Sequence, residues 1–103
     1  MSELEDALDF QLTAAGVAFE REVLFCERRW RLDFAFPGKV AVEVQGGLWR
    51  GGAHNRGRGV HRDIEKHNRA VELGWVVLYV TAEMIDSGEA LALIERVLAG
   101  RDV

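Results

Sequence analysis

The sequence predicts an α/β fold, in which one domain over residues 1–103 forms a mixed four-stranded sheet flanked by helices. Two patterns carry this prediction. Apolar residues alternate with other residues over positions 30–45, as in strands with one buried face, and they form an uninterrupted run, WVVLYV, at positions 75–80. Around these segments apolar residues recur with helical spacing. The chain has 103 residues, 49% hydrophobic and 29% charged, which is enough for one core.

The first half is expected to form one helix and three strands. Ser2 can cap a helix that runs to about Ala15 and ends at Gly16. Residues 17–25 predict a strand, and the alternating segment predicts two more strands joined by a loop of residues 37–39. The apolar face of the helix is formed by Leu4, Leu8, Leu12 and Ala15.

The second half is expected to alternate helix and strand. One helix covers about residues 60–73 and stops at Gly74, and a last helix covers residues 88–99. Between them, the run at 75–80 predicts a central strand buried on both faces, with a short helical turn after it at 82–86. The expected core stripe of the first of these two helices is Val60, Ile64 and Val71.

Two acidic residues in the alternating segment predict a metal site. The expected register places Asp33 opposite Glu43 on the face away from the core, with Cβ atoms about 4.5–5.5 Å apart. Like charges so placed repel each other, and a divalent cation bound by oxygen ligands would relieve the repulsion. A surface ion pair with Arg31 is the alternative. On the first helix, Glu5 is the acidic residue nearest the buried face, about 20° from Leu12 around the helix axis.

A basic, glycine-rich segment follows these strands. Residues 49–69 hold six Lys or Arg residues against two acidic residues, a balance of +4 in a chain with net charge −4. Glycines let backbone N–H groups approach a phosphate closely, so the segment predicts an anion-binding surface. A solvated loop is the alternative. The candidate residues for contacting DNA are Trp49, Arg50, His54, Arg56, Arg58, His61 and Arg62.

The aromatic and imidazole side chains near this segment allow more than one interpretation. Trp49 can stack on an unpaired base or close the end of the core. His54 and His61 flank the basic segment and suit phosphate contacts. His67 lies on the apolar stripe of its helix, so we expect a hydrogen-bonded core histidine there rather than a metal ligand.

Other features exclude several classes. The single cysteine, Cys26, cannot form an internal disulfide and indicates a reducing compartment, so we expect a cytoplasmic location. One cysteine is also too few for a common structural zinc site. Ser2 and Ser87 lie near expected helix starts, which argues against a serine hydrolase. No apolar run is long enough to span a membrane.

The element order, together with Asp33 and the string Glu43-Val44-Gln45, resembles the PD-(D/E)XK nuclease superfamily, which has a restriction-endonuclease-like αβββαβ core. The runs VEVQGGLWRGGAHNRG, DIEKHN and GWVVLYVT are similar to small phage-type endonucleases related to Holliday-junction resolvases and very-short-patch-repair-like nucleases. The resemblance covers nearly the whole chain. It implies a metal-dependent, structure-selective DNA endonuclease of a bacterial or phage-infected cell, acting on branched DNA as a homodimer.

The resemblance also implies the metal ligands. Asp33, Glu43 and the Val44 carbonyl would bind Mg²⁺ or Mn²⁺, and Glu5 would be the additional acid. The metal would activate a water molecule for attack on the phosphodiester and offset the charge of the leaving oxygen.

One position departs from the superfamily pattern. Gln45 stands where a lysine is usual, and its amide can position a water molecule but supplies no charge. Lys66, on the following helix, is the candidate for the relocated cation. An i,i+3 ion pair between Lys66 and Asp63 on a solvent face is the alternative.

Three other functions stay open. A nicking or mismatch-directed endonuclease could use the same fold, although no base-reading element is recognisable. A catalytically inactive DNA-binding module would account for the missing lysine at position 45. A subunit-interaction domain would need no nucleic acid, but the clustered basic residues are unexpected for it.

Overall fold

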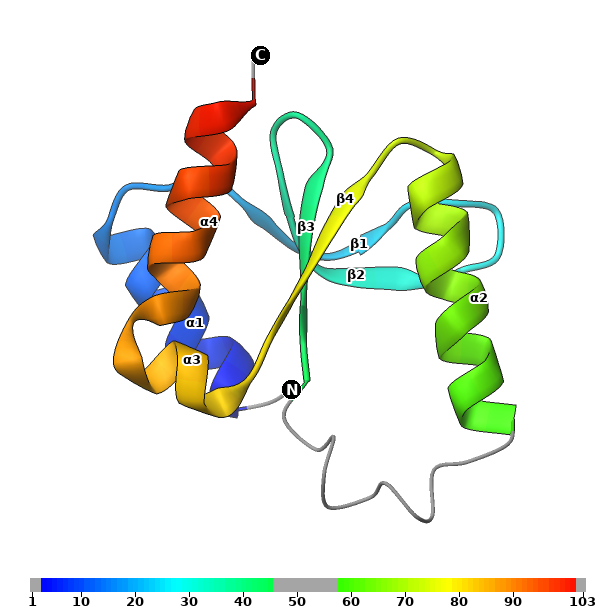
Figure 1. Cartoon of the computed structure of the whole chain (residues 1–103), viewed down its shortest axis with the longest axis horizontal. Coiled ribbons are helices and arrows are strands. Elements are labelled where there is room, and N and C mark those ends of the chain that lie inside the picture. Colours follow the sequence, from blue (N-terminus) through cyan, green and yellow to red (C-terminus); the bar gives the residue numbers. More distant parts are fainter. Residues whose placement is uncertain (1–2, 46–57, 102–103) are drawn as a thin grey trace.

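Four strands form one mixed sheet in the order β1-β2-β3-β4 (Figure 1). The computed structural model describes residues 3–45 and 58–101, apart from the side chains of residues 58–60. The antiparallel strands are β1 (Glu20–Leu24), β2 (Arg31–Phe36) and β3 (Val40–Val44), and β4 (Val76–Val80) pairs parallel with β3. This confirms the α/β class and the mixed four-stranded sheet.

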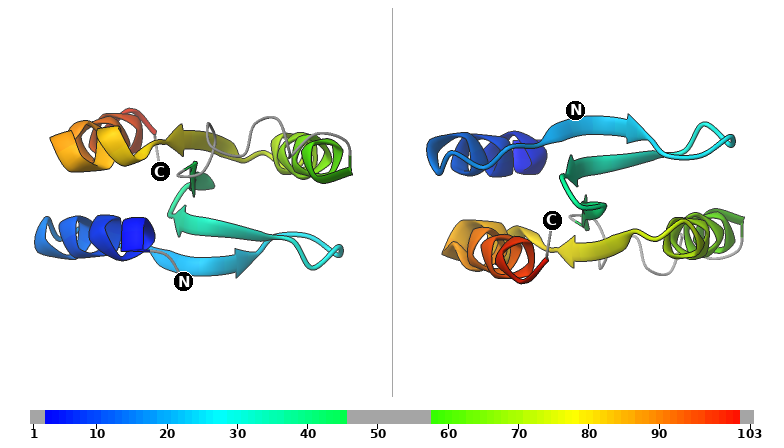
Figure 2. Two further views of the ribbon diagram at one scale, coloured as in Figure 1. Left: turned by 90° about the horizontal axis from the view of Figure 1, so that it is seen from below. Right: turned by 90° about the horizontal axis from the view of Figure 1, so that it is seen from above.

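Helices lie on two opposite sides of this sheet. On one side α1 (Glu3–Ala14), α3 (Ala82–Ser87) and α4 (Glu89–Gly100) contact one another, and α2 (Arg58–Glu72) lies on the other side (Figure 1, Figure 2). All helix boundaries fall within two residues of the sequence-based expectation. Gly88 ends α3 with a left-handed φ of 87°, so that α4 begins directly after it.

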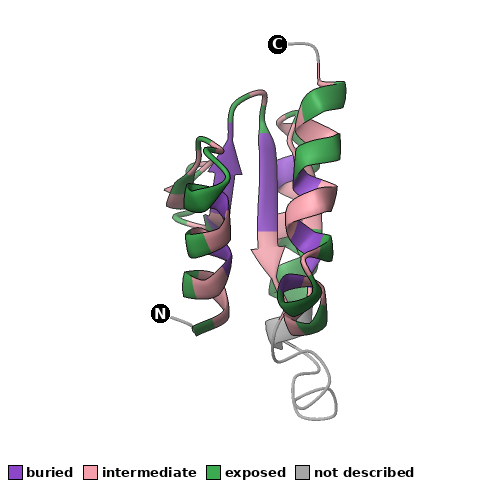
Figure 3. Cartoon of the chain, turned by 90° about the vertical axis from the view of Figure 1, so that its left-hand side faces the viewer, coloured by how far each residue is buried: buried purple, intermediate pink, exposed green. Residues whose placement is uncertain are grey.

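The main core joins the sheet to α1, α3 and α4. Figure 3 shows buried residues on the strands and on the helices that face the viewer. Leu8 and Leu12 of α1 are completely buried there, as their spacing predicts. They pack in one cluster with Phe34 of β2 and with Ile85 and Ile94 of the C-terminal helices. Each such side chain contributes about 1.5–3 kcal/mol of burial free energy, so this cluster anchors α1 to the strands that carry the acidic residues.

The hairpin of β2 and β3 has the expected register. Phe36 pairs with Val40 and Phe34 pairs with Val42. The connecting loop uses left-handed backbone at Gly38 (φ 83°) and at Lys39 (φ 61°). The Lys39 ammonium group also donates a hydrogen bond of 2.7 Å to the Leu73 carbonyl, which ties the loop to the end of α2.

Two expectations about the second half are wrong. Strand β4 is an edge strand rather than a central one, and its Tyr79 is 46% exposed. The expectation that Ile64 and Val71 of α2 belong to the core is also wrong, because each is 53% exposed. Among the described side chains of α2, Ala70 is the buried one. The physical reason is that α2 approaches the sheet through Ala70 and through polar side chains that line a cavity.

None of the helices within the described ranges is both long enough and apolar enough to cross a membrane.

Candidate active site

Asp33 and Glu43 lie one position beyond the last paired residues of the β2–β3 ladder. Each carboxylate accepts a hydrogen bond from the backbone of the opposite strand. The Asp33 N–H donates to Glu43 Oε2 at 2.7 Å, and the Val44 N–H donates to Asp33 Oδ2 at 2.8 Å. These charge-assisted bonds hold both side chains in place and offset the repulsion between them.

Partial burial gives the Asp33 carboxyl group a raised pKa. Its pKa is raised from 3.8 to about 6, mainly by loss of hydration and also by the nearby charges of Glu43 and Glu5, whereas the Val44 N–H and Lys66 act in the opposite direction. The negative form of Asp33 is therefore held at a free-energy cost that a bound cation would remove.

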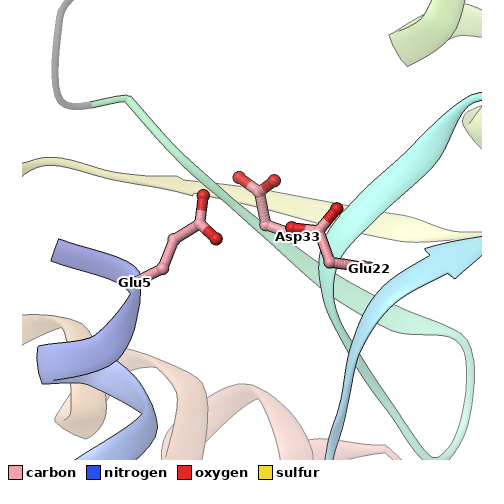
Figure 4. Close-up of side chains that lie close together, drawn as sticks. All are labelled: Glu5, Glu22 and Asp33. Carbon is pink, nitrogen blue, oxygen red and sulfur yellow. The ribbon is translucent and has the colours of Figure 1, made fainter. Parts of the chain in front are cut away.

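Three carboxylates converge on one point beside β2 (Figure 4). They come from Glu5 of α1, Glu22 of β1 and Asp33 of β2, and one oxygen of each lies within 4.8 Å of the others. An all-oxygen set of this kind suits Mg²⁺ or Mn²⁺. Glu5 is one of the residues that the sequence predicts at a metal site, and that prediction stays open, whereas Glu22 was not among the predicted residues.

Glu22 reaches this cluster because the backbone of β1 departs from regular strand geometry. Its neighbours Arg21 and Val23 pair with β2, whereas Glu22 itself has a left-handed φ of 54°. This conformation is uncommon for a residue with a side chain and cancels the strict alternation of faces. The β1–β2 register, which no short turn signal fixes, is what places Glu22 across from Asp33.

The expectation that Asp33 and Glu43 present their carboxylates to one face is also wrong. Asp33 lies with Glu5 of α1, whereas Glu43 is bound by Lys66 of α2. The alternation of β2 changes at this point, because Leu32 lines a cavity beside α2 while Phe34 belongs to the core beside α1. The two acids thus reach toward opposite helices from adjacent strands.

Lys66 forms an ion pair with Glu43. Its Nζ donates a hydrogen bond of 2.6 Å to Glu43 Oε1, and the two side chains are only 21% and 12% exposed. Within the described part of the chain, the alternative partner Asp63 is not bonded to Lys66, and Arg31 forms no ion pair with either acid. Lys66 therefore lies where a cation can act on a group bound next to Glu43.

A cavity of about 290 Å³ opens beside this ion pair. Gln45 lies on its wall, and the Gln45 N–H donates a hydrogen bond of 2.8 Å to the Val80 carbonyl. Asp63 also lies on the wall, a position that sequence reasoning did not assign to the site. The full lining is Leu32, Glu43, Val44, Gln45, Asp63, Lys66, His67, Ala70, Val77 and Tyr79.

The remaining predicted site residues are only partly placed. Four of them, Trp49, Arg50, His54 and Arg56, lie outside the described residues, as does the side chain of Arg58 at the start of α2. On α2, His61 and Arg62 are exposed, and His61 Nε2 lies 3.6 Å from Glu65. His67 has a hydrogen-bond partner, as expected, but it is partly exposed rather than a core residue.

Arg21 fixes the acidic end of α1 against the sheet. Its guanidinium group lies 3.1 Å from Glu5, 3.0 Å from Asp6 and 3.2 Å from Asp9, and it packs 5.4 Å from the ring centre of Phe34. The arginine thus holds Glu5 at the cluster with Asp33 and offsets part of the negative charge of Glu5, Asp6 and Asp9.

We expect Arg21→Met to lower the free energy of unfolding by about 1–2 kcal/mol, because it removes an ion-pair network and a cation–π contact. Urea denaturation would measure this. Arg28→Met is the matched control, since Arg28 stacks 4.3 Å from the Trp30 ring centre without joining a helix to the sheet. An equal loss of unfolding free energy in the two variants would contradict the view that Arg21 stabilises the fold by joining α1 to the sheet.

The fold is similar to a solved structure, the catalytic domain of the homing endonuclease I-Bth0305I, with a TM-score of 0.75. The similarity covers 100% of both chains, with 16% sequence identity. No protein-family model matches the chain, and no curated protein sequence matches it. At this identity the likeness establishes the fold: the chain has an α/β architecture that a nuclease catalytic domain also adopts.

Proposed function

We propose that the chain is a metal-dependent DNA endonuclease of the PD-(D/E)XK type. The observation that carries the proposal is the convergence of the Glu5, Glu22 and Asp33 carboxylates next to the Glu43–Lys66 pair. Carboxylates that face one another, with one pKa raised, are typical of groups arranged to bind a cation. The likeness to the homing endonuclease domain supports the assignment only as to fold.

The proposed role of each site residue follows from its contacts. Asp33, Glu5 and Glu22 would hold Mg²⁺ or Mn²⁺, with Glu43 and the Val44 carbonyl as the further ligands that the resemblance implies. The ion would supply a more acidic water molecule and would offset negative charge on the phosphate. Lys66 would bring positive charge to a phosphate oxygen beside Glu43, and the Gln45 amide would orient a water molecule.

Metal binding can be tested without DNA. Titration of the protein with Mn²⁺ or Mg²⁺, followed by calorimetry and by the melting temperature, should give saturable binding and stabilisation in the wild type. Asp33→Asn should weaken both responses. Unchanged metal affinity in Asp33→Asn would show that the ion binds elsewhere.

The function itself is tested with labelled DNA. We expect Mg²⁺- or Mn²⁺-dependent cleavage that a chelator stops, and we propose that four-way or other branched DNA is cut in preference to linear duplex by a homodimer. Shape and backbone contacts, rather than a base-reading element, would give this preference. Matched junction and linear DNAs, with light scattering for the mass, provide the measurement. A monomer that cuts both DNAs equally would contradict the branched-DNA proposal while leaving the nuclease proposal intact.

A sequence- or mismatch-directed endonuclease is the second candidate, because the structurally similar domain belongs to a protein named as a homing endonuclease. Cleavage of one linear sequence within a random library, without preference for branches, would favour this candidate. Complete absence of cleavage with retained DNA binding would favour the inactive DNA-binding module.

The basic segment gives a further prediction. We expect the double substitution of Arg56 and Arg58 by alanine to weaken binding to all DNAs similarly. Removal of one phosphate-binding cation should reduce the slope of log affinity against log salt by about 0.9 on duplex DNA. Band-shift titrations at several salt concentrations would measure this. An unchanged slope would mean that these arginines are only solvated.

A further inference from the structure

Tyr79 and His67 form a stacked pair on the wall of the cavity. The Tyr79 hydroxyl and His67 Nδ1 are 2.9 Å apart, the ring centres are 5.5 Å apart, and the ring planes make an angle of 29°. Tyr79 lies in β4 directly across from Glu43, and His67 follows Lys66 in α2. The pair thus joins α2, which carries Lys66, to β4, the strand next to Glu43 of β3.

The chemistry of the two rings sets the direction of their hydrogen bond. A phenol donates a hydrogen bond more readily than it accepts one, because its oxygen lone pair is delocalised into the ring. Burial raises the pKa of Tyr79 above its usual value, and the charges of Glu43 and Asp63 act in the same direction, so the hydroxyl keeps its proton. A neutral imidazole has one donor and one acceptor nitrogen. If Nδ1 accepts from Tyr79, the imidazole proton resides on Nε2.

We propose that Tyr79 fixes His67 as the Nε2–H tautomer, and that this N–H is a neutral hydrogen-bond donor to a DNA phosphate oxygen in the cavity beside Glu43 and Lys66. The inference rests on the proposed function, and it adds a substrate-binding residue and a positioning residue to the same site. Contacts of this kind hold the DNA backbone in register without reading its sequence.

The cavity gives a reason for a neutral donor at this place. Lys66 is already bonded to Glu43, and Asp63 adds a second acidic group to the wall. A phosphate that enters must lose water, and N–H groups that already point in fixed directions replace that water at little cost. Imidazole supplies such a donor without placing another charge in the cavity.

The tautomer is tested first, by ¹⁵N NMR of the two imidazole nitrogens of His67 at a pH where the ring is neutral. We expect the Nε2–H form to dominate in the wild type. Tyr79→Phe keeps the ring stack but removes the hydroxyl, and it should give a mixture of tautomers. A dominant Nδ1–H form in the wild type, or an unchanged tautomer in Tyr79→Phe, would overturn the positioning role of Tyr79.

The phosphate contact is tested by two substitutions that imitate the two nitrogens separately. The amide of His67→Gln can occupy the place of Nε2, whereas that of His67→Asn can occupy only the place of Nδ1. Fluorescence anisotropy with labelled duplex and four-way DNA, in Ca²⁺ to limit cleavage, gives the affinity. We expect His67→Asn and His67→Ala to weaken binding by about 10-fold or more, and His67→Gln to retain affinity within a few-fold.

Asn68→Ala is the control variant, because Asn68 is the next residue of α2 but lies outside the cavity. It should bind DNA like the wild type. Retained affinity in His67→Asn together with weakened affinity in His67→Gln would mean that His67 acts only through Tyr79, which overturns the proposal. Wild-type affinity in all three His67 variants would overturn it as well, with the proposed function unaffected. A wild-type protein that binds no DNA would contradict both.

Discussion

Asp33→Asn is expected to reduce DNA cleavage by on the order of a thousand-fold, since a catalytic metal supplies several kcal/mol of transition-state stabilisation. The same change should increase the stability of the fold at neutral pH. Asparagine keeps an oxygen that accepts the hydrogen bond from the Val44 N–H, and it removes a half-buried negative charge that faces Glu5 and Glu22. Activity and stability should therefore change in opposite directions.

The pH dependence of this gain follows from the raised pKa of Asp33. In the folded chain the carboxyl group titrates at about 6 rather than at 3.8, so its ionisation opposes folding. Below pH 3.8 the group is protonated in both states, and Asp33→Asn should have the stability of the wild type. The advantage of the variant should grow as the pH rises from the unfolded-state pKa to the folded-state pKa, and it should level off above the latter.

Denaturant unfolding of both proteins at several pH values would measure this effect, with Asp86→Asn as a control at an exposed carboxylate of α3. A constant stability difference across this pH range would mean that Asp33 is not the titrating group. Cleavage within about tenfold of the wild type would remove Asp33 from the metal site.

Lys66→Met is expected to lower kcat by about 10²- to 10³-fold, the usual cost of removing one group that stabilises transition-state charge. The affinity for DNA should change much less, because only one of many phosphate contacts is involved. The substitution also leaves Glu43 with the Asp33 N–H as its remaining partner, so the free energy of unfolding should fall by about 1–3 kcal/mol.

Arg69→Met provides the matched control for this loss of stability. Arg69 lies one turn after Lys66 in α2 and is ion-paired with Glu27 and Glu72, away from the cavity. Both variants lose a cation of the same helix, but only Lys66→Met should lose kcat when the assays are run well below the melting temperature. Similar kcat values for the two variants would assign Lys66 a structural role.

The sequence was sufficient for the architecture because periodicity and turn residues are local signals. Alternation over β2 and β3, the loop with Gly38 and the helical spacing of Leu8 and Leu12 all predicted the correct elements. The place of β4 at the sheet edge was not predictable in this way. A continuous apolar run indicates burial, but it does not say which neighbouring element provides the burial.

The positions of candidate site residues were predictable in the short β2–β3 hairpin. They were less predictable in β1 and in α2, whose placement depends on tertiary packing. Asp33 and Glu43 were chosen as candidates from their positions in the two strands, although their carboxylates have different neighbours, and Glu5 was chosen from its place on the helix. Glu22 was missed because its position depends on a left-handed residue within a strand, which has no sequence signal when that residue is not glycine. The Lys66–Glu43 bond depends on how α2 packs against the sheet, which the sequence does not show directly. The apolar stripe of α2 predicted the wrong contact face, because the helix approaches the sheet mainly through polar side chains and leaves Ile64 and Val71 exposed.

The hydrogen bonds exchanged at the end of the β2–β3 ladder couple cation binding to the backbone. The amide protons of Asp33 and Val44 are held by carboxylate oxygens of the very side chains that are candidate metal ligands. A cation bound to these carboxylates would lower the negative charge on the oxygens that accept the two bonds, and we expect the solvent exchange rates of the two amides to change with it. Hydrogen exchange at these two positions would therefore record site occupancy even in variants that no longer cut DNA.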